Sequence, residues 1–307
     1  MQPDLRVRIG SMELKNPVTV ASGTYGYGTE YRSFYNPERL GAMFLKGVTL
    51  EARPGNAPQR LVETPSGLMN AIGLQNVGID EFIDHKVPPL EGMQTRCIAN
   101  ICGSSPEQYL RLVEQLNEIQ RIDAFELNFS CPNVKEGCLT IGSDPGQTEH
   151  LTRQAVARTA RPVIVKLSPN VRSMAQTAQA AEAGGAAAVS VMNTFLALSI
   201  DVQTRRPRLG NVTGGLSGPA IRPIAVRMVW EAAQAVGIPV IGQGGIMTAE
   251  HALEFMIAGA SAVSIGTANF VDPMAPMEVI EGITAYLVRH GIGSVRELVG
   301  SLELPAD

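Results

Sequence analysis

Eight short, nearly continuously apolar segments, separated by helical patterns or long connections, predict an α/β protein with the fold of a (β/α)8 TIM barrel. Strands read this way when helices cover both faces of a parallel sheet. The length of 307 residues suits one large α/β domain, and a hydrophobic content of 45% is enough for a sizeable core. We therefore expect residues 1–307 to form a single domain.

The predicted strands are rich in Val, Ile and Ala. In chain order they cover residues 17–22, 42–47, 97–102, 124–129, 162–167, 187–192, 238–243 and 262–267. Helical patterns lie between them. We expect a helix over 105–119, which opens with a Ser N-cap candidate followed by Pro, another over 173–185, which stops at glycines, and a third over 248–260.

Three segments exceed what a minimal barrel needs. Residues 4–16 predict an N-terminal hairpin, and residues 48–95 and 195–217 are insertions after the second and sixth strands. Because each insertion follows the carboxyl end of a strand, we expect both at the C-terminal face of the barrel, where active sites of this fold form.

Charge and cysteine content exclude several classes of function. The net charge is −4 and no basic stretch predicts nucleic-acid or anionic-membrane binding. The first residues have no apolar stretch typical of a secretory signal, and no run approaches the roughly 18 apolar residues of a spanning helix. The four cysteines form no CxxC pair, so we expect no disulfide framework, no metal site and no iron–sulfur cluster on this chain. A reducing cytoplasm is the predicted compartment.

Glycine-rich loops follow the last two predicted strands. "GQGGI" covers 242–246 and "GTA" covers 266–268, while "SGPA" at 217–220 is predicted to open the helix before the seventh strand. Turn glycines alone would explain one such loop. Two of them, after strands seven and eight, are typical of the phosphate site of this fold.

Two lysines each end an apolar strand. Lys46 follows "AMFL" and Lys166 follows "PVIV". One such lysine could simply extend its ammonium into water. Two at the predicted mouth of the barrel favour a cation for a cofactor ring or a substrate carboxylate, with a Schiff-base lysine as the competing interpretation.

Asparagines gather at the same predicted face. They are Asn70, Asn100, Asn128, Asn133 and Asn193. Each alone could be a turn residue, but Asn100 and Asn128 end apolar strands, where a buried amide needs partners. Several amides offer both donors and acceptors, which suits a planar ring with imide-like edges.

Cys131 lies beyond the end of its strand, in a glycine-containing loop over 131–146 that could close over a ligand. We interpret Cys97 and Cys102, in the third strand, as small buried hydrophobes. The thiol of Cys131 could be a nucleophile, or a base once deprotonated. No histidine is near it in sequence, which argues against a Cys–His dyad.

Six motifs together carry a resemblance to a known family. They are "NAIGLQN" (70–76), "NFSCPNV" (128–134), "VIVKLSPN" (163–170), "MNT" (192–194), "GQGGI" (242–246) and "SIGT" (264–267). From about residue 5 to the C-terminus the chain resembles dihydroorotate dehydrogenases, the flavin enzymes of pyrimidine synthesis. The resemblance implies one FMN per chain and oxidation of dihydroorotate to orotate.

The motifs also resemble one subtype of that family. Cysteine in the "SCPN" loop is similar to the cytosolic class 1, whereas the membrane-associated class carries serine there and an N-terminal extension, for which this barrel begins too early. "NAIGLQN" and "NVKEGC" (133–138) resemble subtype 1B, although Cys138 stands where that subtype more often has glycine. Subtype 1B implies a homodimer of this chain plus two partner subunits, which carry FAD and a [2Fe–2S] cluster and pass electrons to NAD.

The resemblance also implies roles for individual residues. Cys131 is implied as the base that removes the proton from C5 of dihydroorotate while hydride leaves C6 for N5 of FMN. The implied substrate residues are Lys46, Asn70, Ala71, Ile72, Gly73, Leu74, Asn128, Asn133, Asn193 and Thr194. The implied FMN residues are Ser22, Lys46, Gly47, Asn100, Asn128, Lys166, Met192, Gly218, Gly244, Gly245, Gly266 and Thr267.

Alternative functions remain at this point. The nearest are a fumarate-linked class 1A homodimer and a dihydropyrimidine dehydrogenase-like flavoenzyme. More distant are an aldolase-type barrel with Lys166 as Schiff-base former and a non-catalytic flavin-binding barrel. A protein without a flavin spectrum would favour the aldolase, and a yellow protein that dihydroorotate cannot bleach would favour the inert binder.

Overall fold

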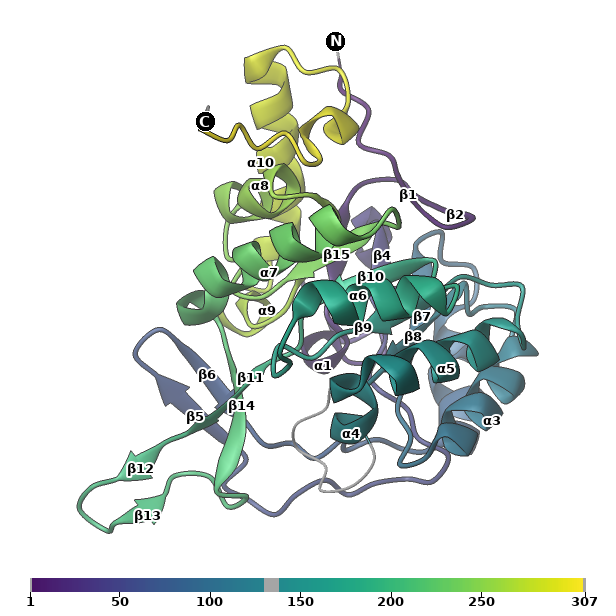
Figure 1. The fold of residues 1–307 in the computed structure, drawn as a ribbon, viewed down its shortest axis with the longest axis vertical. Coiled ribbons are helices and arrows are strands. Elements are labelled where there is room, and N and C mark those ends of the chain that lie inside the picture. The colour runs from purple at the N-terminus through teal and green to yellow at the C-terminus, as the bar shows by residue number, and fades with distance from the viewer. Residues whose placement is uncertain (1, 130–137, 306–307) are drawn as a thin grey trace.

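Eight parallel strands close into a barrel, in the spatial order β10-β15-β16-β3-β4-β7-β8-β9 (Figure 1). The computed structural model describes residues 2–129 and 138–305. The barrel strands are β3 (Val18–Val20), β4 (Ala42–Phe44), β7 (Arg96–Ile101), β8 (Ala124–Asn128), β9 (Val163–Lys166), β10 (Ala188–Val191), β15 (Val240–Gln243) and β16 (Ala260–Ile265). Each lies within or overlaps a predicted strand, so the predicted fold class is confirmed.

Helices surround the barrel, and the three helices predicted from the sequence start where expected. The observed helices are α1 (Ser22–Tyr25), α2 (Ile79–Glu81), α3 (Pro106–Asn117), α4 (Cys138–Ser143), α5 (Pro145–Val156), α6 (Met174–Ala183), α7 (Arg222–Ala235), α8 (Ala249–Ile257), α9 (Ala268–Val271) and α10 (Ala275–His290). The side chains of Ser105, Ser173 and Thr248 accept backbone N–H bonds at the starts of α3, α6 and α8. These caps satisfy donors that a helix start leaves unpaired.

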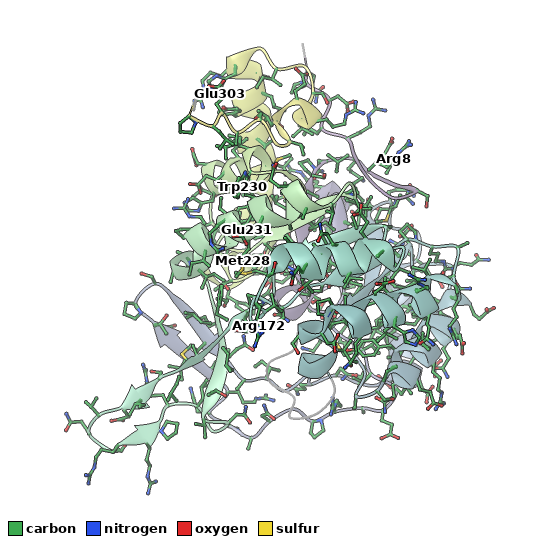
Figure 2. All side chains as sticks on the ribbon, in the orientation of Figure 1. Arg8, Arg172, Met228, Trp230, Glu231 and Glu303 are labelled. Carbon is green, nitrogen blue, oxygen red and sulfur yellow. The ribbon has the colours of Figure 1, made fainter. Side chains whose placement is uncertain are left out.

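One apolar core joins the two ends of the chain, since it runs from Val7 to Leu298. The predicted hairpin is β1 (Val7–Ile9) paired with β2 (Met12–Leu14). Its turn packs against the amino-terminal end of the barrel, where a Cβ on Gly10 would lie 2.9 Å from Cβ of Ala187. Charged side chains such as Arg8 and Glu303 point outward from this framework (Figure 2).

The two long insertions meet in one antiparallel sheet, which the sequence analysis did not predict. Its strands, in the order β11-β14-β6-β5, are β11 (Phe195–Leu198), β14 (Thr213–Ser217), β6 (Gly67–Asn70) and β5 (Leu61–Thr64). We call it the insertion sheet. It has a small core of its own, made of Val62, Met69, Ala71 and Leu209.

A narrow ribbon extends the insertion sheet away from the barrel (Figure 1). It consists of β12 (Ile200–Asp201) paired with β13 (Arg206–Pro207). "SGPA" also differs from expectation, because a 3-10 turn over Pro219–Ile221 precedes α7. Within the described residues, no helix has both the length and the apolar character needed to cross a bilayer.

Candidate active site

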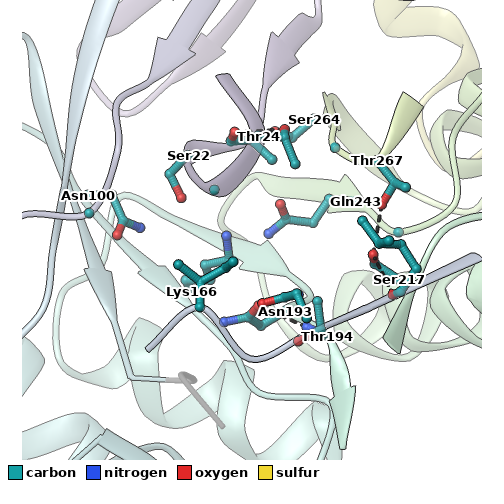
Figure 3. Close-up of a pocket in the computed structure, with 18 of the residues that line it drawn as sticks. Ser22, Thr24, Asn100, Lys166, Asn193, Thr194, Ser217, Gln243, Ser264 and Thr267 are labelled. Carbon is teal, nitrogen blue, oxygen red and sulfur yellow. Dashed lines mark hydrogen bonds between the residues drawn. The ribbon is translucent and has the colours of Figure 1, made fainter. Parts of the chain in front are cut away.

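A cavity of about 330 Å³ opens at the carboxyl ends of the barrel strands (Figure 3). Every barrel strand contributes a lining residue within two residues of its end. In chain order these include Ser22, Lys46, Asn100, Asn128, Lys166, Met192, Gln243 and Ser264. The insertion sheet supplies Leu61, Leu68, Asn70 and Ser217. Both the size and the position are typical of a small-molecule site in this fold.

Most of the predicted site residues line this cavity. They are Ser22, Lys46, Gly47, Asn70, Ile72, Gly73, Leu74, Asn100, Asn128, Lys166, Met192, Asn193, Thr194, Gly218, Gly244, Gly245, Gly266 and Thr267. Ala71 does not: its side chain is fully buried in the core of the insertion sheet. Cys131 and Asn133 lie outside the described residues.

Three glycines bring backbone close together on one side of the cavity. Gly218, Gly244 and Gly245 have φ angles of +94°, +125° and +78°, a backbone region that residues with a Cβ atom rarely adopt. A Cβ on Gly245 would lie only 2.8 Å from the carbonyl oxygen of Gly218. Nearby, Thr267 Oγ1 donates to Ser217 Oγ at 2.8 Å. Such exposed backbone beside hydroxyls fits a phosphate group.

Lys46 contributes a half-buried cation to the cavity. Its backbone N–H donates to the carbonyl of Gly26 at 2.7 Å, which fixes the chain just beyond β4. Burial lowers the pKa of Lys46 below its ordinary value of 10.5, nearby Arg60 lowers it further, and Glu30 opposes both. A carboxylate ligand would relieve this unfavourable environment.

A chain of polar contacts crosses three neighbouring strands beneath the cavity. Lys166 Nζ on β9 lies 3.9 Å from Glu126 Oε2 on β8. Asn100 Nδ2 on β7 donates to the same carboxylate oxygen. Asn128 Nδ2 in turn donates to Asn100 Oδ1 at 3.3 Å. The amides at the strand ends are therefore oriented by a buried network rather than by turns.

Gly47 shows how closely this network is packed. A Cβ at this position would lie 2.8 Å from Asn100 Oδ1. A side chain there would displace the amide that joins Glu126 to Asn128, so glycine at position 47 is a requirement of the network.

Two buried polar atoms on the cavity wall have no hydrogen-bond partner among the described residues. They are Gln243 Nε2 and Ser264 Oγ, on adjacent strands β15 and β16. Figure 3 shows the Gln243 amide extending into the cavity. An unsatisfied buried donor costs about 1–3 kcal/mol. A ligand with acceptor atoms would remove that cost, which fits the imide-like edge of a flavin ring.

Gln243 and Ser264 in the cavity wall, and Glu126 behind it, were not predicted from the sequence. A signal existed for Gln243, because it ends an apolar strand as Lys46 and Lys166 do. Glu126 also carried one, since an isolated carboxylate inside an apolar strand needs a partner. Ser264 gave none, because a small hydroxyl residue is common in such strands.

Cys97 and Cys102 are fully buried, as predicted. Burial raises the pKa of Cys97 to about 12, so its thiol stays protonated at neutral pH. Neither cysteine lines the cavity.

The fold and the site define a barrel protein with a polar, glycine-lined cavity at its mouth. A family model described as dihydroorotate dehydrogenase matches residues 4–287. The chain belongs to the dihydroorotate dehydrogenase family and is an oxidoreductase of that kind. The family resemblance of the sequence motifs is thereby confirmed.

Similar proteins support the same assignment. The chain is 52% identical over 303 residues to a protein of Trichlorobacter lovleyi (99% of this chain, 100% of the relative) named dihydroorotate dehydrogenase B (NAD(+)), catalytic subunit. A protein of Bacteroides fragilis with the same name is 50% identical over 301 residues (98% of this chain, 99% of the relative). The crystal structure of DHODH from Eimeria tenella in complex with ferulenol shares the fold, with a TM-score of 0.80 at 20% identity, over 97% of this chain and 88% of that one.

Proposed function

We propose that this chain is a catalytic subunit that oxidises dihydroorotate to orotate in pyrimidine biosynthesis, with FMN bound at the mouth of the barrel. One observation carries the proposal: the cavity combines closely packed glycines, a buried lysine and two buried polar atoms that have no partner in the described part of the chain. That set matches the phosphate, the charge and the ring edge of FMN. Family membership supports the flavin assignment.

Different groups of the described residues would bind different parts of the cofactor. Gly218, Gly244, Gly245, Gly266 and Thr267 surround the position that suits a phosphate. The remaining predicted FMN residues, namely Ser22, Lys46, Gly47, Asn100, Asn128, Lys166 and Met192, line the rest of the wall. When bound, FMN supplies a hydride acceptor. The Lys166 ammonium would stabilise negative charge that develops in the cavity.

The substrate would lie against the amides and Lys46. Asn70, Asn128, Asn193 and Thr194 offer donors and acceptors to a planar ring, and Lys46 offers a cation to its carboxylate. We propose Cys131 as the base that takes the proton from C5, with Asn133 beside it in sequence. This role rests on the "SCPN" motif.

We further propose that the electrons leave to NAD+ through a partner subunit that carries FAD and a [2Fe–2S] cluster. The relatives are named catalytic subunits of NAD(+)-linked enzymes, which supports a partner. The four cysteines of this chain lack the spacing for a cluster of their own. We propose two copies of each subunit, and one FMN-binding domain over residues 1–307 in a cytoplasmic protein.

The isolated chain should reduce dyes with dihydroorotate but should not reduce NAD+. Without the partner, electrons have no route to a nicotinamide. The measurement is steady-state turnover of the purified chain, after its flavin spectrum has been shown to bleach with dihydroorotate under anaerobic conditions. Appreciable NAD+ reduction by the chain alone would contradict the partner proposal. Rapid fumarate reduction would instead assign the chain to the fumarate-linked homodimers, and a colourless protein would reject FMN.

Gly245→Ala should weaken FMN binding by about tenfold or more, because a Cβ would enter the space between Gly245 and the Gly218 carbonyl. The dissociation constant is measured by flavin fluorescence with the apoprotein. Gly185→Ala is the control: its φ of +89° imposes similar backbone strain, but its Cβ would make an ordinary 3.5 Å contact with Val156, away from the cavity. Equal losses in both variants would assign the effect to strain.

Orotate binding should take up a proton at alkaline pH through Lys46. In the free protein the pKa of Lys46 lies below 10.5 because of burial. A bound carboxylate raises it, so affinity should fall as pH rises through the free-protein pKa. Calorimetry in buffers of different ionisation enthalpy measures the uptake. Lys46→Met is the control, because any proton uptake that remains in it comes from groups other than Lys46, including orotate itself. Identical uptake in both proteins would exclude Lys46 as the group that takes up the proton.

A further inference from the structure

Glu126 is a buried carboxylate that none of the assignments above uses. It is 1% exposed, and among the described residues Glu126 and Lys166 are the only buried charged side chains. Glu126 does not line the cavity, whereas Lys166 and Asn100 both do. Any influence of Glu126 on a bound ligand must therefore pass through these two neighbours or through its electric field.

Both neighbours converge on one oxygen of Glu126. Lys166 Nζ lies 3.9 Å from Oε2, and Asn100 Nδ2 donates to the same atom. Asn100 then accepts from Asn128 Nδ2 at 3.3 Å and from Cys102 Sγ at 3.5 Å. One carboxylate thus orients three polar side chains that come from β7, β8 and β9.

Stability alone is a poor reason for this arrangement. A buried ion pair usually adds little compared with apolar residues of the same volume, because removing two charges from water is costly. The pair faces the cavity on its lysine side only. Its position indicates a role in the charge that Lys166 presents to the ligand.

We propose that Glu126 is a positioning residue that holds Lys166 and Asn100 in place and partly neutralises Lys166. The inference rests on the proposed function, since it assigns the lysine's charge to a bound flavin. A lone buried ammonium would stabilise an anionic reduced flavin strongly. With its counter-charge 3.9 Å away, Lys166 presents a weaker positive field, and the reduced flavin gives up its electrons more readily.

The test is the flavin midpoint potential of Glu126→Gln. Glutamine keeps the shape and an oxygen that can accept from Asn100, but it removes the negative charge. The potential should rise, and the equilibrium constant for flavin reduction by dihydroorotate should increase by about tenfold. An unchanged or lower potential, with FMN bound, would overturn the inference.

Asp123→Asn is the matched control. Asp123 directly precedes β8, pairs with Arg96 at 2.9 Å and Arg121 at 2.8 Å, and does not line the cavity. The substitution removes the same charge from a residue just before the same strand, at the other end of the barrel. A rise in potential of equal size in this variant would also overturn the inference, because the effect would then be one of net charge.

A second comparison tests the inference if Glu126→Gln does not fold. The double variant Glu126→Gln/Lys166→Met removes both charges of the pair, whereas Lys166→Met leaves Glu126 without its cation. The double variant should have the higher potential of the two, and equal potentials would refute the counter-charge. If the unsubstituted chain binds no flavin, the proposed function itself fails. If it binds flavin and only the potentials do not respond, the inference alone fails.

Discussion

Replacing Cys131 by serine should slow flavin reduction by dihydroorotate by about 10²–10⁴-fold near neutral pH, the range for loss of a general base. A serine hydroxyl is far harder to deprotonate than a thiol, so the proton at C5 would lose its acceptor. FMN should remain bound, because the substitution changes none of the residues proposed to hold it. Anaerobic stopped-flow measurement of flavin bleaching gives the rate.

Two comparisons separate loss of the base from a general disturbance. Cys97→Ala also removes one thiol, but from a buried site outside the cavity, and should leave the rate unchanged. Raising the pH should recover part of the rate in Cys131→Ser, because a larger fraction of the serine hydroxyl is then ionised. Reduction at the unsubstituted rate would remove Cys131 from the mechanism.

Lys166→Ala should lower the flavin midpoint potential and destabilise the fold. The substitution removes the cation from the cavity wall and leaves Glu126 buried without its ion-pair partner. Breaking a buried ion pair costs about 3–5 kcal/mol of unfolding free energy. Spectroelectrochemical titration measures the potential, and urea unfolding of the same preparation measures the stability.

Lys86→Ala provides the control for net charge. Lys86 lies over the ring of Tyr27, with its Nζ 5.7 Å from the ring centroid, and does not line the cavity. Its loss should leave the potential unchanged. If Lys166→Ala binds FMN fully and has the potential of the unsubstituted protein, Lys166 does not stabilise charge on the flavin.

The barrel could be predicted because its strands and helix starts are each marked by a short local sequence pattern. Each strand is a short apolar run, and the helix starts carry cap residues such as Ser105 and Thr248 whose side chains make the expected bonds. Side chains at strand ends follow from the same pattern, since parallel strands all end at one face. That rule correctly predicted that Lys46, Lys166 and Asn100 lie at the same cavity.

The insertion sheet could not be predicted in this way. Asn70 on β6 pairs with Gly215 on β14, and its Nδ2 donates to the Gly215 carbonyl from 145 residues away. Strand register over such a separation depends on the folded barrel and not on a local pattern. The same limit applies to Ala71, whose backbone neighbours line the cavity while its own side chain faces the sheet's core.

The insertion sheet also determines when, during translation, the cavity wall can form. β5 and β6 leave the ribosome well before β11 and β14, so early in translation they lack the strands they pair with. Asn70 can reach its partner only after residue 215 has been made. The cavity wall also includes Gly266 and Thr267, so FMN or dihydroorotate would meet a finished binding surface only after these residues have been made.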